Sequence, residues 1–502
     1  MPPHPHGVQP EGNLWLLAPQ AAAAAHAKRS TGLGNLARLD DPTLLTVCSF
    51  SGAAALAALC CASDTLSAYA SCEELWQSLC LRRAVKSSKE FSDAPSEPFA
   101  GFCGSWKASC LAAMRTTSAR GGSPPTLRAH TRGVSVFSDT LYRPHELTYG
   151  ASAFGKKPAG PLCARLTAAE VAPDAEGFAA AWEVGAGRPV VIESAGAVAV
   201  ASGVWEEGAL LGGLGERVFH AGGVNFRLGD YFDYARSNTD DQPLYLFDPT
   251  FNRSAPELLG AYDVPPQFSD DLFSLLEGSG PRPDYRWLLI GGPRSGQSWH
   301  QDPNGTSAWN LTLTGRKRWL FFPPSATPPG VVKSADGDVT PISLEEWARQ
   351  FYEEACSTPG CLEAETVAGE VMFVPRGWWH MVRNVAPLTV AVSHHFLSPT
   401  GLHNTIRLLR ESPEEVSGID RGLRPRQDPG PNPPPAAIAM AAADDHERRS
   451  AAGTALLDRL VAALRERRPE ALARAEEDLS RRPRALLPPA ASLPFAFNFL
   501  ES

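Results

Sequence analysis

Residues 285–396 alternate between short apolar stretches and turns rich in glycine and proline, and this pattern restricts the fold more than any other feature of the chain. Turns such as Gly291-Gly292-Pro293 and Pro375-Arg376-Gly377 recur too often for long helices to form. Many short strands separated by such turns are typical of a β-sandwich or jelly roll. The predicted strands are 285–290, 298–302, 306–313, 317–322, 370–374, 378–383 and 388–396.

The jelly-roll domain is predicted to extend over residues 165–400. Within it, an insert at 325–368 contains a predicted helix at 344–355, and the insert is expected to lie on the outside of the sheets. Residues 401–502 are predicted to form a C-terminal helical region with a proline-rich linker at 420–439. Together with helices predicted near the N-terminus, these elements predict an α+β fold class.

The first part of the chain is predicted to contain a disordered tail, a small helical domain and a connector. Residues 1–33 show little apolar periodicity, which favours disorder. From residue 36 to 80, apolar residues recur at helical spacing, which predicts a compact bundle of short helices. With its extension this bundle covers 34–118, and residues 119–164 are interpreted as the connector. The bundle is too small to be an enzyme, so its apolar faces form its own core or bind a partner helix.

Composition and charge narrow the class of protein. A hydrophobic content of 43% and a charged content of 20% are typical of a globular chain. The net charge of −9 argues against a surface that binds nucleic acid, although the arginine-rich segment 462–484 leaves a local basic patch open. No apolar run is long enough to span a bilayer, so no membrane partner is expected. The absence of a CxxC pair among ten cysteines favours free thiols, and a nuclear or cytoplasmic location is expected.

The tetrapeptide Trp299-His300-Gln301-Asp302 is the strongest candidate for chemistry. Alternate residues of a strand point to the same face, so His300 and Asp302 can direct an imidazole nitrogen and a carboxylate oxygen to one point. His380, which follows the Pro375-Arg376-Gly377 turn, can provide a third ligand from another strand. Two histidines and one carboxylate suit a non-haem Fe(II) ion with open coordination positions. The alternative is a pair of buried histidines with a purely structural role.

Lys317 is the candidate cation inside the jelly roll. It lies on a predicted strand whose other residues are strongly apolar, and an inward-pointing lysine there needs an anionic partner. Its neighbours Arg316 and Arg318 are expected to point the other way, to solvent. The opposite arrangement, with Lys317 exposed and both arginines inside, is costlier because it buries two guanidinium groups.

The segment from Tyr285 to Pro324 (YRWLLIGGPRSGQSWHQDPNGTSAWNLTLTGRKRWLFFPP) closely resembles the JmjC-domain oxygenases. The similarity is to the subgroup of the lysyl hydroxylase and proposed arginine demethylase once called the phosphatidylserine receptor. The motifs PLYLFD (243–248), FSDDLF (268–273) and VPRGWWHMVRN (374–384) also resemble that subgroup, so the resemblance covers about 165–400. It implies a cupin-like double-stranded β-helix with Fe(II), 2-oxoglutarate as cosubstrate and O2 as the second cosubstrate.

The resemblance also implies roles for individual residues. His300, Asp302 and His380 match the iron ligands of the family. The residues that match contacts to 2-oxoglutarate are Tyr245, Asn310, Lys317 and Ser393, with Lys317 and Tyr245 at its distal carboxylate. His394 and His395 replace other polar residues of the family, and one residue is inserted near Ala386-Pro387, which affects the alignment of Ser393. His395 shares a strand face with Ser393, so it faces the substrate or has a structural role.

Residues 39–80 resemble an F-box, with a Leu-x-x-Pro-like start and a Glu-Leu-Trp-x-x-Leu-Cys end. F-boxes bind the Skp adaptor of cullin–RING ubiquitin ligases through an apolar helical face. The resemblance therefore implies Skp as a partner, with the paired Leu44 and Leu45 on the binding face. An F-box joined to this JmjC type is an architecture found in plants and algae.

Two functions follow from these features. The first is a 2-oxoglutarate-dependent dioxygenase that hydroxylates or demethylates lysine or arginine side chains of a protein or peptide substrate, with histones among the candidates. The second is a substrate adaptor of a ubiquitin ligase whose jelly roll binds a target without turnover. The intact His300, Asp302 and His380 set, with Lys317, favours the enzyme. A small-molecule or RNA oxygenase is the remaining alternative.

Overall fold

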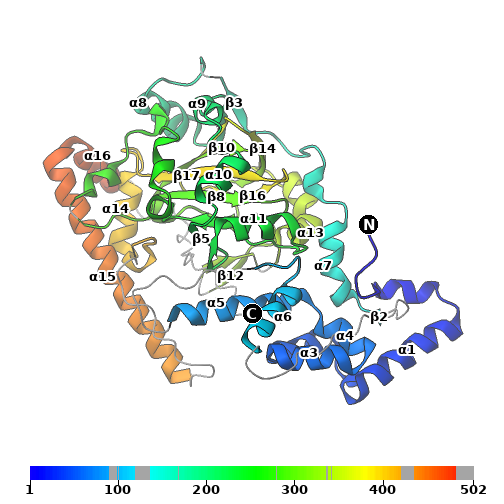
Figure 1. Cartoon of the computed structure of the whole chain (residues 1–502). Helices are drawn as coiled ribbons and strands as arrows, with labels where there is room; N and C mark the ends of the chain where they lie inside the picture. Colours follow the sequence, from blue (N-terminus) through cyan, green and yellow to red (C-terminus); the bar gives the residue numbers. More distant parts are fainter. Residues whose placement is uncertain are drawn as a thin grey trace. The chain divides into compact units, whose positions relative to one another are not determined.

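The computed structural model describes residues 1–89, 99, 101–118, 136–167, 169–278, 280–334, 337–340, 342–419 and 435–481. These residues form two compact units (Figure 1). The N-terminal unit contains Met1–Gly155 and Leu214–Leu244, and the jelly-roll unit contains Lys156–Gly213 and the described residues from Tyr245 onward. The predicted connector at 119–164 lies largely outside the described residues up to residue 135, as does most of the linker at 420–439.

The N-terminal unit is mainly helical. Its helices are α1 (Pro19–Leu33), α2 (Asp41–Ser49), α3 (Ala53–Ala62), α4 (Asp64–Ala70), α5 (Glu73–Lys89), α6 (Trp106–Ser118), α7 (Asp139–Tyr149) and α11 (Leu228–Ser237). Its strands are β1 (Val8–Gln9), β2 (Val136–Phe137), β5 (Val218–Ala221) and β6 (Val224–Arg227). Leu44 of α2 and Tyr69 of α4 are buried in one core cluster, so the short helices of the predicted bundle pack on one another.

Helix α1 corrects the prediction that residues 1–33 are a disordered tail. The segment is rich in alanine, which has the highest helix propensity, although it lacks the apolar periodicity that would have indicated a helix. Arg29 anchors α1 to the bundle, because its guanidinium lies 2.7 Å from Asp41 Oδ1 and also bonds to the hydroxyl of Tyr69. The Tyr69 hydroxyl donates to the same Asp41 oxygen at 2.6 Å. Helix formation is therefore supported by tertiary contacts that sequence periodicity does not reveal.

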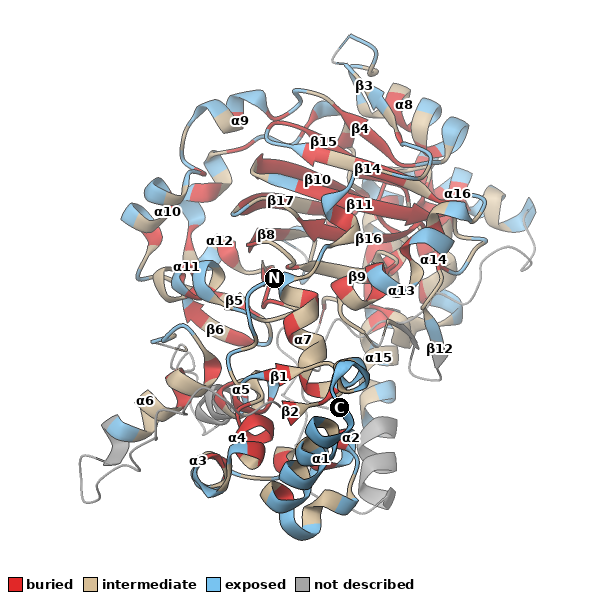
Figure 2. Ribbon diagram, turned by 90° about the vertical axis from the view of Figure 1, so that its right-hand side faces the viewer, coloured by how far each residue is buried: buried red, intermediate tan, exposed pale blue. Residues whose placement is uncertain are grey.

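The jelly-roll unit is built from two sheets. The strands of the larger sheet that belong to this unit are, in order, β3 (Ala164–Leu166), β4 (Val190–Ile192), β15 (Val371–Val374), β10 (Ser307–Thr314), β17 (Thr389–Phe396), β8 (Arg286–Gly291) and β7 (Leu246–Asp248). The smaller sheet contains, in order, β14 (Leu362–Val367), β11 (Arg316–Phe322), β16 (Trp379–Asn384) and β9 (Gly296–His300). Buried residues dominate the central strands of both sheets (Figure 2). The α+β jelly-roll prediction is thereby confirmed.

Apolar side chains from both sheets meet between them. Val191 and Met372 of the larger sheet share a core cluster with Phe321 and Val382 of the smaller one. Period-two alternation explains this arrangement, because every second residue of each strand points inward. The remaining strands are β12 (Val332–Ser334) and β13 (Gly337–Val339).

Helices surround the jelly roll. They are α8 (Ala175–Phe178), α9 (Ala197–Ala201), α10 (Glu207–Leu214), α12 (Phe251–Ser254), α13 (Leu344–Ser357), α14 (Leu402–Glu411), α15 (Pro435–Arg467) and α16 (Pro469–Arg481). The predicted C-terminal helices contribute Leu456, Leu460 and Leu464 to a buried cluster that includes Leu272 and Ile406, so they pack on the jelly-roll unit. Among the helices of the described ranges, none combines the length and the apolar character that crossing a membrane requires.

The insert at 325–368 differs from its prediction at one end. Helix α13 lies where a helix was predicted, but residues 362–367 form strand β14, which pairs with β11 inside the smaller sheet. The segment Leu362-Glu363-Ala364-Glu365 carries two glutamates, and glutamate is uncommon in strands. Glu363 is nevertheless fully buried, because a buried arginine neutralises it.

That arginine is Arg318, and its position corrects the expectation that both neighbours of Lys317 reach solvent. Arg316 is exposed, but only 1% of Arg318 is accessible. Arg318 Nη2 lies 2.8 Å from Glu363 Oε2 and 2.7 Å from the Tyr352 hydroxyl. Glu363 Oε1 also accepts the backbone N–H of Gly160 at 2.7 Å. At Arg318 the outer face of β11 is covered by this polar network, whereas Arg316 on the same face reaches solvent as predicted.

We expect Arg318→Met to lower the free energy of unfolding by about 3–5 kcal/mol, because it leaves the Glu363 carboxylate buried without its cation. Urea denaturation of the purified protein measures the loss. Arg316→Met is the matched control, since it removes an exposed guanidinium from the same strand and should change stability by less than about 1 kcal/mol. Equal effects of the two substitutions would contradict the importance of the buried pair.

Candidate active site

His300, Asp302 and His380 converge at one end of the jelly roll. His300 is the last residue of β9, Asp302 follows two residues later, and His380 lies on β16 directly opposite His300 in the strand register. Asp302 Oδ1 lies 3.7 Å from His380 Nε2 and 4.0 Å from His300 Nε2. The ligand atoms of the three residues all lie within 4.8 Å of one another. Three candidate residues that are separated along the chain therefore offer two nitrogens and one oxygen to a single point.

Backbone carbonyls fix the tautomer of both histidines. His300 Nδ1 lies 2.7 Å from the carbonyl oxygen of Ser298, and His380 Nδ1 lies 3.1 Å from that of Trp378. A carbonyl only accepts hydrogen bonds, so each Nδ1 carries the proton and each Nε2 presents its lone pair. Outer hydrogen bonds of this kind orient metal-binding histidines.

Protonation states at the site also suit a cation. Burial, followed by the nearby His380, lowers the pKa of His300 to about 3, and burial likewise lowers the pKa of His380. Burial alone would raise the pKa of Asp302, but the surrounding imidazoles, His395 first, hold it below its usual value. Two neutral imidazoles and one carboxylate form a donor set for a divalent transition metal. Asp302 Oδ2 is buried and has no hydrogen-bond partner in the described part of the chain, as expected for an atom near a metal position.

A buried lysine lies at the other end of the same cavity. Lys317 of β11 is completely inaccessible, and its Nζ donates to Asn310 Oδ1 at 3.1 Å. Burial lowers the pKa of Lys317 to about 7. Among the residues that the structure describes, no carboxylate forms an ion pair with this amine. A buried amine without a counter-ion is a site that an anionic ligand would stabilise.

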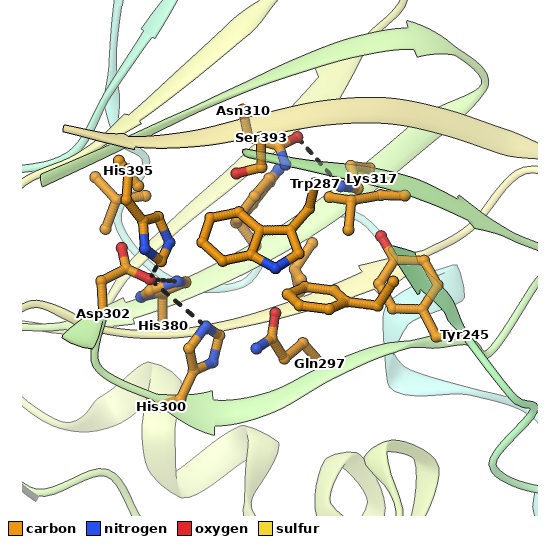
Figure 3. A pocket seen from close by; sticks show the side chains of 16 residues that line it. Tyr245, Trp287, Gln297, His300, Asp302, Asn310, Lys317, His380, Ser393 and His395 are labelled. Atoms are coloured by element: carbon orange, nitrogen blue, oxygen red, sulfur yellow. Dashed lines mark hydrogen bonds and ion pairs between the residues drawn. The ribbon is translucent and has the colours of Figure 1, made fainter. Parts of the chain in front are cut away.

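The two ends belong to one cavity, whose lining includes both the three metal-binding candidates and Lys317. Figure 3 shows Trp287 between the His300, Asp302 and His380 cluster on one side and Lys317 with Tyr245 on the other. The lining residues are Tyr245, Phe247, Trp287, Leu289, Gln297, His300, Asp302, Ala308, Asn310, Lys317, Trp319, Val374, His380, Val382, Ser393 and His395. All seven site residues named from the sequence therefore line this cavity.

Sequence reasoning did not identify Trp287, Phe247 and Gln297 as lining residues. Trp287 pairs with Ser393 in the register of β8 and β17, so period-two alternation places it on the same face as a candidate residue. Phe247 contacts Trp287, with ring centroids 5.6 Å apart. The sequence signal for Trp287 was thus available, while Gln297 becomes evident only when the sheets close over the cavity.

Comparisons with known proteins agree with this geometry. The cupin-like domain family matches residues 206–400. The chain is 34% identical over 422 residues to "Arginine-specific demethylase JMJ22" of Arabidopsis thaliana, covering 83% of this chain and 78% of that protein. It is 40% identical over 189 residues to "Bifunctional arginine demethylase and lysyl-hydroxylase psr-1" of Caenorhabditis elegans, covering 36% of this chain and 46% of that protein. It is 31% identical over 190 residues to "2-oxoglutarate and iron-dependent oxygenase JMJD4" of Danio rerio, covering 37% and 43% respectively.

Proposed function

Because this chain belongs to the cupin-like JmjC family of iron- and 2-oxoglutarate-dependent oxygenases, we propose that it oxidises arginine or lysine side chains of proteins. The observation that carries the proposal is the single cavity with two unlike ends. One end gathers His300, Asp302 and His380, and the other holds the buried amine of Lys317. A dicarboxylate that chelates a metal through its 2-oxo acid and ends in a second carboxylate matches both ends.

In this proposal each residue has a defined role. His300, Asp302 and His380 hold Fe(II) through Nε2, a carboxylate oxygen and Nε2. When bound, Fe(II) with 2-oxoglutarate and O2 supplies the oxidising power to hydroxylate an unactivated C–H bond. Lys317 pairs with the distal carboxylate of 2-oxoglutarate, and the Tyr245 hydroxyl contacts the same group. Asn310 and Ser393, which are paired on the adjacent strands β10 and β17, provide further contacts to 2-oxoglutarate.

The residues that line the cavity favour a substrate with a cationic or methylated side chain. Asp302 is the one carboxylate among the lining residues, and the proposal assigns it to the metal. Among the aromatic rings that line the cavity, those of Trp287 and Phe247 can recognise a guanidinium or ammonium through cation–π contact. Hydroxylation of an N-methyl group gives a product that releases formaldehyde, whereas hydroxylation of a side-chain carbon leaves the oxygen in place. The same site chemistry therefore serves demethylation or hydroxylation.

The test is incubation of purified protein with Fe(II), ascorbate and 2-oxoglutarate, together with methyl-arginine peptides or unmodified lysine peptides. We expect succinate to form with at least one peptide class, and mass spectrometry identifies a lost methyl group or a gained oxygen. Formaldehyde release assigns demethylation, and a stable oxygen assigns hydroxylation. Tight metal binding without any succinate would refute the enzymatic proposal and favour a binding module.

The pH dependence of 2-oxoglutarate binding gives a further prediction. Lys317, with its pKa lowered to about 7, loses its proton in the free protein as the pH rises above that value. The dicarboxylate needs the protonated amine, so binding above pH 7 requires uptake of a proton. The dissociation constant of 2-oxoglutarate should rise by up to about tenfold per pH unit between about pH 7 and about pH 9. Calorimetry with Co(II) present measures it, and a Lys317→Met variant should lose this dependence.

A second proposal concerns the N-terminal unit, which we propose binds a Skp-type adaptor as an F-box does. Two apolar side chains support this proposal: Phe50, at the end of α2, is 86% exposed and Val47 is 46% exposed. Leu44 is buried in the core of the bundle and Leu45 packs against that core, so neither is suited to the exposed face that the F-box resemblance implied.

We expect Val47→Ser with Phe50→Ser to abolish capture of a purified Skp adaptor, because the pair removes exposed apolar contact area while leaving the core of the bundle intact. Pull-down with the full chain measures the binding. Thr46→Ser, on the exposed side of the same helix, is the control. Retained binding by the double variant, or no binding by the unaltered chain, would contradict the proposal.

A further inference from the structure

Strand β17 places a third histidine beside the candidate metal position. His395 lies two residues after Ser393, so both side chains point from the same face of the strand into the cavity. Directly opposite His395 on β10 is Ala308, whose small side chain leaves room for the imidazole ring. The backbone N–H of His395 donates to the carbonyl of Tyr285 at 2.7 Å. The backbone of His395 is thus held on both sides.

The ring of His395 is directed at the carboxylate of Asp302. His395 Nε2 lies 3.1 Å from Asp302 Oδ1, which is shorter than the distance from that oxygen to either His300 or His380. Figure 3 shows His395 above Asp302, with the contact drawn. The ring of Trp287 lies beside His395, with centroids 4.3 Å apart and the planes tilted by 53°. The imidazole is therefore confined by an aromatic side chain on one side.

His395 does not join the three residues at the metal position. The group whose ligand atoms lie within 4.8 Å of one another, searched over the described residues, consists of His300, Asp302 and His380. A carboxylate oxygen has two lone pairs, so Asp302 Oδ1 can accept a hydrogen bond from His395 and still face the other two imidazoles. The geometry is that of an outer partner to a metal-binding carboxylate.

Asp302 needs such a partner because of its place in the fold. Strand β9 ends at His300, so Asp302 lies beyond the hydrogen-bonded ladder, immediately before Pro303. Its second oxygen, Oδ2, has no hydrogen-bond partner among the described residues. The orientation of the carboxylate is consequently not set by the strand or by Oδ2.

We propose that His395 is a positioning residue of the metal centre, which donates its Nε2–H to Asp302 and holds that carboxylate toward His300 and His380. The proposal rests on the proposed function, because it assumes that the three residues bind a metal. It assigns a specific task to a position where the family resemblance indicates a different polar residue. Outer partners of metal ligands typically change metal affinity by about 10–100-fold when they are removed.

The test is Co(II) binding to the full chain without 2-oxoglutarate, followed through the d–d absorption of the bound ion. We expect His395→Leu, which removes the donor but keeps an apolar side chain, to weaken Co(II) binding by about 10–100-fold and to alter the absorption spectrum. His395→Gln, which retains an N–H donor, should restore most of the affinity. Rescue by a donor would not follow from a role in packing alone.

The matched control is His394→Leu. His394 is the neighbouring residue on β17, but its Nε2 lies 2.8 Å from the Tyr262 hydroxyl and it is not among the residues that line the cavity. This control should bind Co(II) as tightly as the unaltered chain. Unchanged affinity in His395→Leu, or equal losses in both leucine variants, would overturn the inference. Failure of the unaltered chain to bind Co(II) would instead refute the proposed function.

Discussion

Asp302→Ala should reduce succinate formation to the level seen without added metal. The substitution removes the one carboxylate that faces the two Nε2 atoms, and two neutral imidazoles alone do not neutralise a divalent cation. Metal-dependent turnover should therefore disappear at every 2-oxoglutarate concentration, unlike a defect that excess cosubstrate can overcome. The measurement is succinate produced per enzyme with Fe(II) and ascorbate, with and without the best peptide substrate.

Asp263→Ala is the control for Asp302→Ala, since Asp263 is an exposed carboxylate of the same unit. It should retain the activity of the unaltered chain. Circular dichroism should show an unchanged fold for Asp302→Ala, because no described backbone group depends on its carboxylate. Residual metal-dependent succinate above a few per cent would mean that Asp302 is not a ligand.

Lys317→Met should raise the KM for 2-oxoglutarate by roughly 30-fold or more while leaving Co(II) affinity unchanged. A buried charge pair that loses one partner costs about 2–5 kcal/mol of binding free energy, which corresponds to that change. Lys317 lies at the end of the cavity remote from the three metal-binding candidates, so the metal position should not be affected (Figure 3). Succinate formation over a range of 2-oxoglutarate concentrations separates KM from kcat.

Lys317→Met should weaken 2-oxoglutarate binding, but it should not lower the folding stability of the protein. The pKa of Lys317 is lowered by burial, which means that the folded protein disfavours the charged amine when no anion is bound. Below about pH 7 the amine is protonated in both the folded and the unfolded protein, and the folded protein bears the full penalty of burying the charge. The penalty declines as the pH rises from about 7 toward the ordinary pKa of lysine, because the folded protein then holds the neutral amine. Lys317→Met should therefore melt no lower than the unaltered chain at pH 7 without 2-oxoglutarate. Arg316→Met, exposed on the same strand, is the control, and a KM change in that variant would contradict the assignment.

Local pattern predicted most of the jelly roll because strands and turns are encoded within a few residues. Strands β10, β11 and β17 lie within about a residue of their predicted ranges, since apolar stretches and turn residues define their ends. The predicted strand 298–302 was wrong at its end, because β9 stops at His300 and Asp302 follows two residues beyond it. Helix α1 was not predicted, because what holds it is the contact of Arg29 with Asp41 and not periodicity.

What could not be predicted depends on pairs of residues that are distant in sequence. Arg318 was expected to reach solvent because its partner, Glu363, is 45 residues away on a strand that was not recognised. Each of the two charges looks unsuitable for a core when it is considered alone. The contact of His395 with Asp302 has the same character, because His395 lies on the larger sheet and Asp302 follows the last residue of β9 in the smaller one.

The alternation of cations along β11 has a consequence for how the chain folds. Lys317 points into the cavity and Arg318 points to the opposite face, where Glu363 neutralises it. If β11 paired with its neighbours one residue out of register, every side chain would exchange faces. The bulky guanidinium would then enter the cavity beside Asn310, and Glu363 would lose the cation that neutralises it. Lys317 and Arg318 together therefore favour the native register of β11 over a register shifted by one residue. Folding intermediates with the shifted register should be too unstable to persist.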